Sequence, residues 1–198
     1  MKQRLLITFL SLCLLMPGIQ AQSQTIWRID TVHSSVQFKV THMIVSSVTG
    51  NFRDFNGTLK SPKAKDFKGS SVNVTIKTAS IHTDNVTRDK HLRDEDFFAA
   101  GTYPTITFVS KSFTEIAENK YLITGDLTIR DVTKPVELIA NYKGSIEQSG
   151  KILAGFEASG TINRFDFGLQ WDDTLDSGSL VVGEKVDIIL NIKLTRDK

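Results

Sequence analysis

Apolar and polar residues alternate with a period of two along most of the chain, as is typical of β-strands with one buried and one solvated face. The alternation is clearest in four segments, at residues 36–40, 72–76, 136–142 and 186–194. Turn-forming residues separate further apolar runs, at residues 118–120 and at Ser149-Gly150. Asn56-Gly57 reads either as a hairpin turn or as a kink within one long strand. This pattern predicts an all-β fold.

About eight such strands and almost no helix leave two architectures, a sandwich or a closed antiparallel barrel. The interior of a barrel of about eight strands is just wide enough to be filled by side chains or to hold one small ligand. The chain contains 12 phenylalanines. They fit either a solid core or a lumen with an elongated apolar ligand inside it, and periodicity alone leaves both readings open.

One segment departs from the strand pattern. Asp84-Asn85 can cap a helix, and residues 86–98 favour one. Two pairs of opposite charge stand at i, i+4 spacing, Asp89 with Arg93 and Lys90 with Asp94. We expect one short helix in a loop across one end of the barrel. Most of its charges would face solvent, and Phe97 and Phe98 would point at whatever it covers.

The first 21 residues have the pattern of a secretory signal peptide. Lys2 and Arg4 precede an apolar run at residues 5–16, and a helix break and the small residue Ala21 follow. The run is too short for a permanent membrane anchor, which needs about 20 apolar residues, although an uncleaved anchor is the alternative. We expect residues 1–21 to be removed and residues 22–198 to form a single soluble domain, periplasmic or secreted, without stable membrane insertion.

Composition excludes several classes of function. Without Lys2 and Arg4 the chain carries 22 basic and 22 acidic residues. Because no excess of positive charge remains, we expect no nucleic-acid partner. Cys13, the only cysteine, lies in the predicted signal, so the mature chain forms no disulfide of its own. The oligomeric state is left open, a dimer included.

The histidines are the obvious candidates for chemistry. His33, His42, His82 and His91 match no zinc-binding spacing, and the chain has no nucleotide-binding or hydrolase motif. Asp30, His33 and Ser34 resemble a catalytic triad only through their closeness in the sequence. We therefore expect no metal, no cofactor and no enzymatic activity.

Four blocks of sequence stand out together. They are Trp27-Arg-Ile-Asp-Thr-Val-His-Ser34 with residues 36–52, Thr83 to Phe98 leading to Tyr103-Pro104, Gly125 to Ile129 with Thr133-Lys-Pro-Val136, and Arg164-x-Asp-Phe-Gly168 with residues 182–186. Over essentially all of residues 26–195 these blocks resemble the YceI-like family. Asp131 departs from the pattern, because the family usually has glycine there, and aspartate adopts left-handed backbone less readily.

The resemblance implies an extended, lipocalin-like antiparallel β-barrel of about eight strands in the bacterial periplasm. Members of the family bind long isoprenoid chains, such as a polyprenyl pyrophosphate or a quinone, or other long apolar chains, without cofactor-dependent catalysis. A carrier of such a lipid is therefore the leading hypothesis. The alternatives are an enzyme that acts on the lipid through a His/Arg/Asp site at the barrel mouth, and a solid-cored stress or structural protein without ligand.

The predicted site has two parts. The lumen would be lined by thirteen apolar residues: Phe38, Val40, Phe52, Val74, Ile76, Phe97, Phe98, Phe108, Leu127, Ile129, Phe156, Ile188 and Leu190. The mouth would hold His42, Arg88, Asp89 and His91. There Arg88, with His91 or His42, would meet a polar or anionic headgroup, for which a planar guanidinium is well suited. Alternatively, Arg88 and Asp89 only tie the loop to the barrel by hydrogen bonds.

Overall fold

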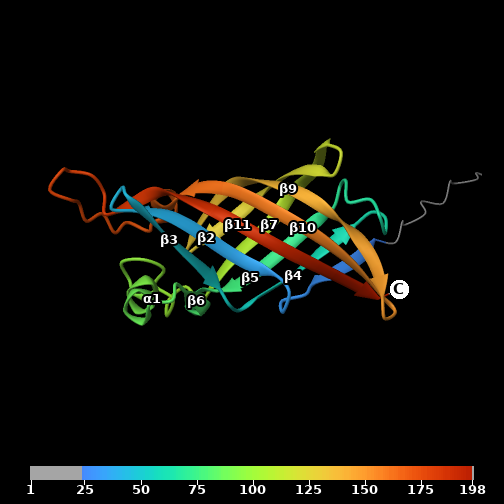
Figure 1. Ribbon diagram of the computed structural model, residues 1–198, viewed down its shortest axis with the longest axis horizontal. Coiled ribbons are helices and arrows are strands. Elements are labelled where there is room, and N and C mark those ends of the chain that lie inside the picture. The colour runs from blue at the N-terminus through green and yellow to red at the C-terminus, as the bar shows by residue number, and fades with distance from the viewer. Residues whose placement is uncertain (1–23, 198) are drawn as a thin grey trace, which may run out of the picture.

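The computed structural model describes residues 24–197 and consists mainly of long antiparallel strands wound into a barrel (Figure 1). The strands are β1 (Thr25–Ile29), β2 (Ser35–His42), β3 (Ser46–Phe52), β4 (Phe55–Ser61), β5 (Ser71–Lys77), β6 (Ile81–His82), β7 (Thr105–Ala117), β8 (Lys120–Ile129), β9 (Val132–Gln148), β10 (Lys151–Asn163) and β11 (Val182–Asp197). The helices are α1 (Val86–Arg93) and two short 3₁₀ turns, η1 (Thr78–Ser80) and η2 (Arg164–Phe167).

The wall of the barrel has eight strands because three of them are interrupted. β1 and β2 both pair antiparallel with β11 and so form two parts of one strand. In the same way β3 and β4 form the next strand, and β5 and β6 the third. β7 to β11 complete the circle, and β1 closes it against β11. The predicted antiparallel barrel of about eight strands is confirmed.

Register places the alternating apolar residues inside the barrel. Phe38 on β2 pairs with Ile188 on β11, and Ala158 on β10 pairs with Leu190. Partners in a ladder share a face of the sheet, so a slip of one residue would turn the whole apolar set outward. Asn56-Gly57 lies inside the β4–β5 ladder, so the hairpin alternative for this dipeptide is wrong.

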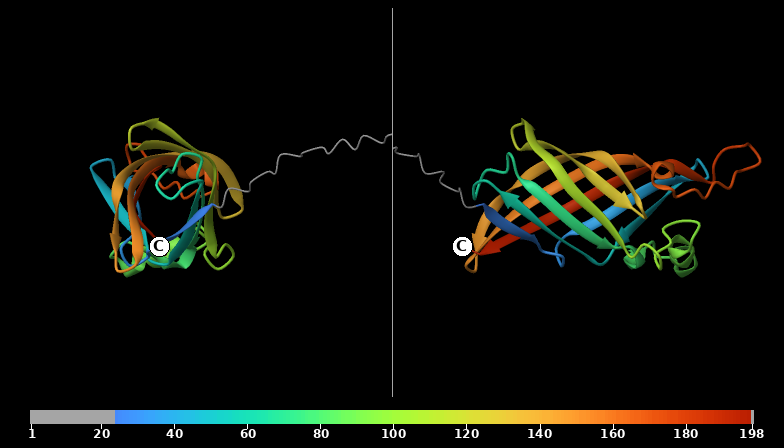
Figure 2. Two further views of the ribbon diagram at one scale, coloured as in Figure 1. Left: turned by 90° about the vertical axis from the view of Figure 1, so that its right-hand side faces the viewer. Right: turned by 180° about the vertical axis from the view of Figure 1, so that it is seen from behind.

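Packed aromatic rings fill the end of the barrel where β11 finishes. Phe67, from the loop between β4 and β5, is 1% exposed and lies 4.9 Å from Phe156 and 5.5 Å from Trp27, between ring centroids. The indole N–H of Trp27 donates a hydrogen bond to Ser61 Oγ at 3.1 Å. Tyr142 also contacts Phe67, at 5.2 Å. Figure 2, on the left, shows this loop over part of the barrel end, where the packed rings form an aromatic plug.

α1 lies beside the opposite end of the barrel (Figure 1). The side chain of Asn85 caps it by accepting a hydrogen bond from the backbone N–H of Arg88 at 3.0 Å. The helix ends at Arg93 and not at Phe98 as expected, because Asp94 adopts extended backbone. The segment after α1, at residues 94–100, then enters the barrel end and brings Phe97 and Phe98 inside.

The expected surface ion pair between Asp89 and Arg93 is replaced by other contacts. Asp89 is 4% exposed and accepts hydrogen bonds from Thr83, whereas Arg93 donates to the carbonyl oxygens of Ala79 and Ile81. The expectation that the helix charges face solvent is therefore wrong for Asp89. Its position one turn into the helix faces the barrel, where a buried carboxylate needs hydrogen-bond donors.

The turn between β8 and β9 holds its left-handed residue one position before Asp131. Arg130 has a φ of 57° and Asp131 is not in the left-handed region. The guanidinium of Arg130 donates to the carbonyl oxygens of Gly168 at 2.9 Å and of Phe97 at 3.2 Å. Arg130 thereby joins the turn to the two segments that cover the barrel end.

Candidate functional site

A cavity of about 230 Å³ lies inside the barrel, between the aromatic plug and the covering segments. Its wall is formed by valine, leucine, isoleucine, alanine and phenylalanine side chains, together with Gln37, Thr58 and Arg164. For comparison, an apolar cavity of about 150 Å³ stays dry and accepts a molecule the size of benzene. The interior is therefore hollow, which argues against the solid-cored alternative.

All thirteen residues predicted for the lumen lie in the wall of this cavity. Strand residues on the predicted face are Phe38, Val40, Phe52, Val74, Ile76, Phe108, Leu127, Ile129, Phe156, Ile188 and Leu190, and Phe97 and Phe98 come from the covering segment. The ring of Phe52 lies 6.0 Å from that of Phe38 and 5.9 Å from that of Phe98. These three rings connect the wall of the cavity to its cover.

Sequence reasoning missed part of the wall. Val36, Val72, Ile192 and Leu194 continue the same alternation in strands already recognised, so the period-two signal was sufficient to find them. Leu92 and Leu169 lie outside the strands, and nothing in their local sequence indicates that they turn toward the cavity.

The four residues predicted for the mouth do not form one site. Arg88 donates from Nε to Thr83 Oγ1 at 2.8 Å and from Nη2 to the Thr83 carbonyl at 2.7 Å. Asp89 accepts from the N–H and the hydroxyl of the same threonine. His91 lies 3.5 Å from Asp96 and packs edge-on against Phe97 and Trp171. His42 is half-buried where β2 ends.

Arg88 and Asp89 therefore meet around Thr83, and neither lines the cavity. Across residues 24–197, no three histidine, cysteine, aspartate or glutamate side chains lie close enough to hold a metal ion. In the same part of the chain, no helix is both long and apolar enough to span a membrane.

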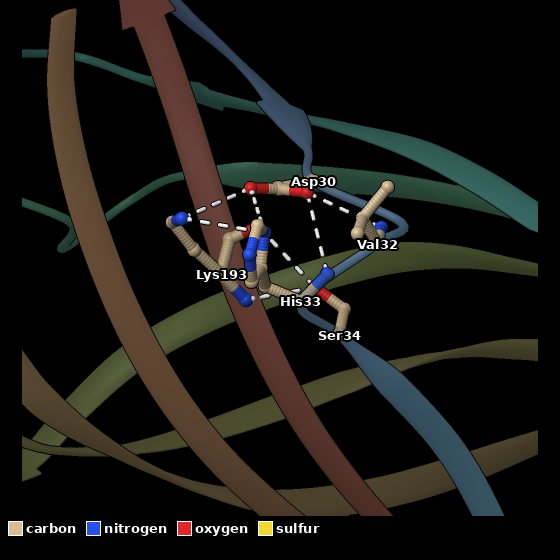
Figure 3. Close-up of polar contacts among 5 residues, drawn as sticks. All are labelled: Asp30, Val32, His33, Ser34 and Lys193. Atoms are coloured by element: carbon tan, nitrogen blue, oxygen red, sulfur yellow. Dashed lines mark hydrogen bonds and ion pairs between the residues drawn. The ribbon is translucent and has the colours of Figure 1, made fainter. Parts of the chain in front are cut away.

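Asp30, His33 and Lys193 form a polar cluster on the outside of the barrel (Figure 3). Asp30 Oδ2 lies 2.8 Å from His33 Nδ1 and 3.1 Å from Lys193 Nζ. Ser34 Oγ instead accepts a hydrogen bond from the backbone N–H of Lys193, at 2.9 Å. The hydroxyl is thus used to hold β11, and the arrangement is not that of a catalytic triad.

The charge of Asp30 is stabilised by its two neighbours. Burial alone would raise the pKa of this carboxyl, but the hydrogen bonds and positive charges of Lys193 and His33 outweigh it and lower the pKa to about 2. β1 pairs with β11 through only two pairs of residues, and this cluster stands next to them. It therefore stabilises the closure of the barrel.

Among residues 24–197, Arg164 is the one charged residue in the cavity wall. It is 2% exposed, and its guanidinium donates to the carbonyl oxygens of Gly183 at 3.0 Å, Leu169 at 2.6 Å and Val182 at 3.0 Å. Burial lowers the pKa of this guanidinium, although the charges of Asp172 and Glu184 oppose the shift. Because three of its N–H groups are aimed at these carbonyls, Arg164 ties Leu169 and the first two residues of β11 together at the end of the barrel.

The fold and the cavity define a lipocalin-like barrel with an apolar internal pocket that is plugged at one end and covered at the other. Residues 27–194 match the YceI-like domain, and the chain belongs to the YceI-like family. The UPF0312 protein of Shewanella sp. (strain W3-18-1) is 37% identical over 173 residues, which are 87% of this chain and 90% of that protein. The resemblance seen in the sequence is confirmed.

Solved structures show the same fold. The crystal structure of the Campylobacter jejuni YCEI protein has a TM-score of 0.64 and 37% sequence identity, and the match covers 81% of this chain and 90% of that one. A polyisoprenoid binding domain from Saccharophagus degradans, implicated in plant cell wall breakdown, matches with a TM-score of 0.62 over 85% of this chain and 97% of its own. Its sequence is 16% identical, so this second likeness concerns the fold alone.

Proposed function

We propose that this protein is a periplasmic carrier that holds one long apolar chain, such as a polyisoprenoid or a quinone, in the cavity of its barrel. The observation that carries the proposal is the cavity itself, with its nearly uninterrupted apolar wall. Each methylene transferred from water into such a wall contributes about 0.8 kcal/mol before ordering costs. A few isoprene units therefore supply enough free energy for binding without a strong polar contact.

Two further observations support the proposal. The structural neighbour from Saccharophagus degradans is described as a polyisoprenoid binding domain. In this chain Phe97 and Phe98 come from a segment outside the barrel strands, so the segment can move to admit a chain without breaking the barrel wall. We infer that these two side chains close over the bound lipid.

The proposal includes export and binding without catalysis. The predicted signal at residues 1–21, with cleavage near Ala21, lies outside the described residues and supplies the route to the periplasm. In this function Arg88 and Asp89 anchor the loop, because both form hydrogen bonds with Thr83. The His/Arg/Asp site that the enzyme alternative requires is therefore not assembled at the barrel mouth.

A titration with a long-chain quinone, monitored by tryptophan fluorescence, tests the proposal. Trp27 lies in the plug and Trp171 packs 5.6 Å from Phe97, so a quinone in the cavity should quench the emission. We expect saturation at one quinone per protein. Phe38→Asp should weaken binding at least about tenfold, because it places a charge in the apolar wall.

Thr41→Asp is the matched control, since Thr41 is exposed on the same strand. It should bind the quinone like the wild type. Equal binding by Phe38→Asp and the wild type would place the ligand outside the cavity and overturn the proposal.

A further inference from the structure

The turn between β2 and β3 exposes three consecutive apolar side chains. Met43 is 46% exposed, Ile44 60% and Val45 90%. We call these three residues the apolar tip. Single exposed apolar residues are common on protein surfaces, whereas contiguous ones indicate a surface that contacts something else.

The backbone of the apolar tip is unfavourable for the residues that occupy it. Met43 has a φ of 51° and Ile44 a φ of 67°, both in the left-handed region. Tight hairpin turns favour asparagine or glycine at such positions, and a β-branched residue is disfavoured there. The sequence therefore keeps apolar side chains where turn stability favours others. Backbone strain of this kind clusters at functional positions in proteins.

The apolar tip lies at the covered end of the barrel and not at the plugged end (Figures 1 and 2). The backbone N–H of Met43 donates to the Val181 carbonyl at 2.8 Å. Val181 ends the loop that begins with Leu169 in the cavity wall and carries Trp171 against Phe97. The apolar tip is thus joined through the loop at residues 169–181 to the segment that covers the cavity.

The charges around the apolar tip indicate which surface it fits. Residues 40–48 and 169–181 contain no lysine or arginine, and the second segment contains Asp172, Asp173 and Asp176. The Asp173 carbonyl accepts a hydrogen bond from Val181 N–H, which places the acidic loop next to the tip. Anionic lipid would be repelled here, whereas a zwitterionic lipid surface would not.

We propose that the apolar tip inserts into the interface of a zwitterionic lipid membrane and sets the covered end of the barrel against it. Apolar side chains of this size bind at the boundary between headgroups and acyl chains without spanning the bilayer. This inference rests on the proposed carrier function for its purpose, because a lipid cargo would leave or enter the barrel at that surface. Contact at the tip would act on the loop through Val181 and so favour opening of the cover.

Flotation with phosphatidylcholine vesicles tests this inference with the double variant Met43→Asn/Ile44→Gly. The substitutions introduce the residues that the turn favours, so the melting temperature should stay the same or rise. The fraction of protein bound to vesicles should nevertheless fall about fivefold or more. Replacing half of the phosphatidylcholine by phosphatidylglycerol should reduce wild-type binding, and added salt should restore it.

Ile146→Asn is the matched control, because Ile146 is 59% exposed near the β9–β10 hairpin at the plugged end. It should float like the wild type. Equal flotation of the tip variant and the wild type, or no flotation of either, would overturn the inference. A dimer that the tip variant loses in gel filtration would assign the tip to a second copy of the chain instead. Lipid binding in the cavity is measured separately, so either proposal can fail while the other stands.

Discussion

The carboxylate of Asp89 accepts two hydrogen bonds from Thr83, at 2.8 Å from its backbone N–H and at 2.6 Å from its hydroxyl. Arg88 donates two more to the same residue, at Oγ1 and at the carbonyl oxygen. Thr83 is 4% exposed and lies in the turn between β6 and α1. Two charged side chains of α1 therefore anchor the helix to the turn that leads into it.

Arg88→Ala should lower stability without changing ligand preference. Because the Arg88 guanidinium contacts Thr83, the variant's affinities for a pyrophosphate-headed prenyl chain and for the matching hydrocarbon should fall by the same factor. Loss of these charge-assisted bonds should cost about 1.5 to 3 kcal/mol of unfolding free energy, seen in denaturant melts. A much larger loss for the pyrophosphate-headed chain would instead assign a headgroup role to Arg88.

Gly50→Ala should narrow the cavity. A Cβ at position 50 would lie 2.3 Å from Cζ of Phe38 and 2.8 Å from Cγ2 of Thr83, so the Phe38 ring must shift. Such overpacking should cost about 1 to 3 kcal/mol and weaken quinone binding. Adding Phe38→Leu should restore part of the stability, because the smaller side chain removes the clash.

Gly155→Ala serves as the control for that experiment. Its added Cβ would meet only Lys143 Cβ, at an ordinary 3.5 Å. Calorimetry should find its melting temperature close to that of the wild type. If Gly50→Ala were equally harmless, the Phe38 ring would not be packed over Gly50 as the structure has it.

The Asp30 cluster predicts a dependence of stability on acid pH. The pKa of Asp30 is about 2 in the folded protein, below the ordinary value of 3.8. A carboxyl with a lowered pKa stabilises the fold fully above its unfolded value, and the contribution is lost as the pH falls through about 2. Asp30→Asn should therefore destabilise the protein by about 1 to 2 kcal/mol at pH 7 and by roughly half as much at pH 3.

Denaturant midpoints of wild type and Asp30→Asn at several pH values measure this difference. Asp176→Asn, which alters an exposed carboxylate in the loop before β11, is the control substitution. A difference between wild type and Asp30→Asn that stayed constant from pH 7 to pH 2 would contradict the role assigned to His33 and Lys193.

The barrel and its lumen could be predicted from the sequence because period two ties each strand residue to one face. Because Phe38 faces inward, its partner Ile188 on β11 does so too, and the alternation along β11 then turns Leu190 inward as well. The same reasoning works for any strand with clear alternation. It explains why every strand residue predicted for the lumen lies in the cavity wall.

The polar contacts could not be predicted in this way, because they depend on where loops meet. The spacing of Asp89 and Arg93 suits a surface ion pair. In the structure, however, Asp89 accepts a hydrogen bond from Thr83 and Arg93 donates to backbone carbonyls. The buried guanidinium of Arg164 donates to the carbonyl oxygens of Gly183 and Leu169, which only the folded chain brings together. In the β8–β9 turn, the comparison with the family pattern pointed to Asp131, whereas the left-handed residue is Arg130.

The most direct test of the central claim is mass spectrometry of an organic extract of the protein, purified from its native host without added lipid. An apolar cavity of about 230 Å³ beneath a covering segment should retain a chain-like lipid through purification. We expect about one long isoprenoid, quinone or comparable apolar chain per protein in the wild type, and its loss in Phe38→Asp. An extract without stoichiometric lipid, or the same lipid at equal amounts in Phe38→Asp, would contradict the account.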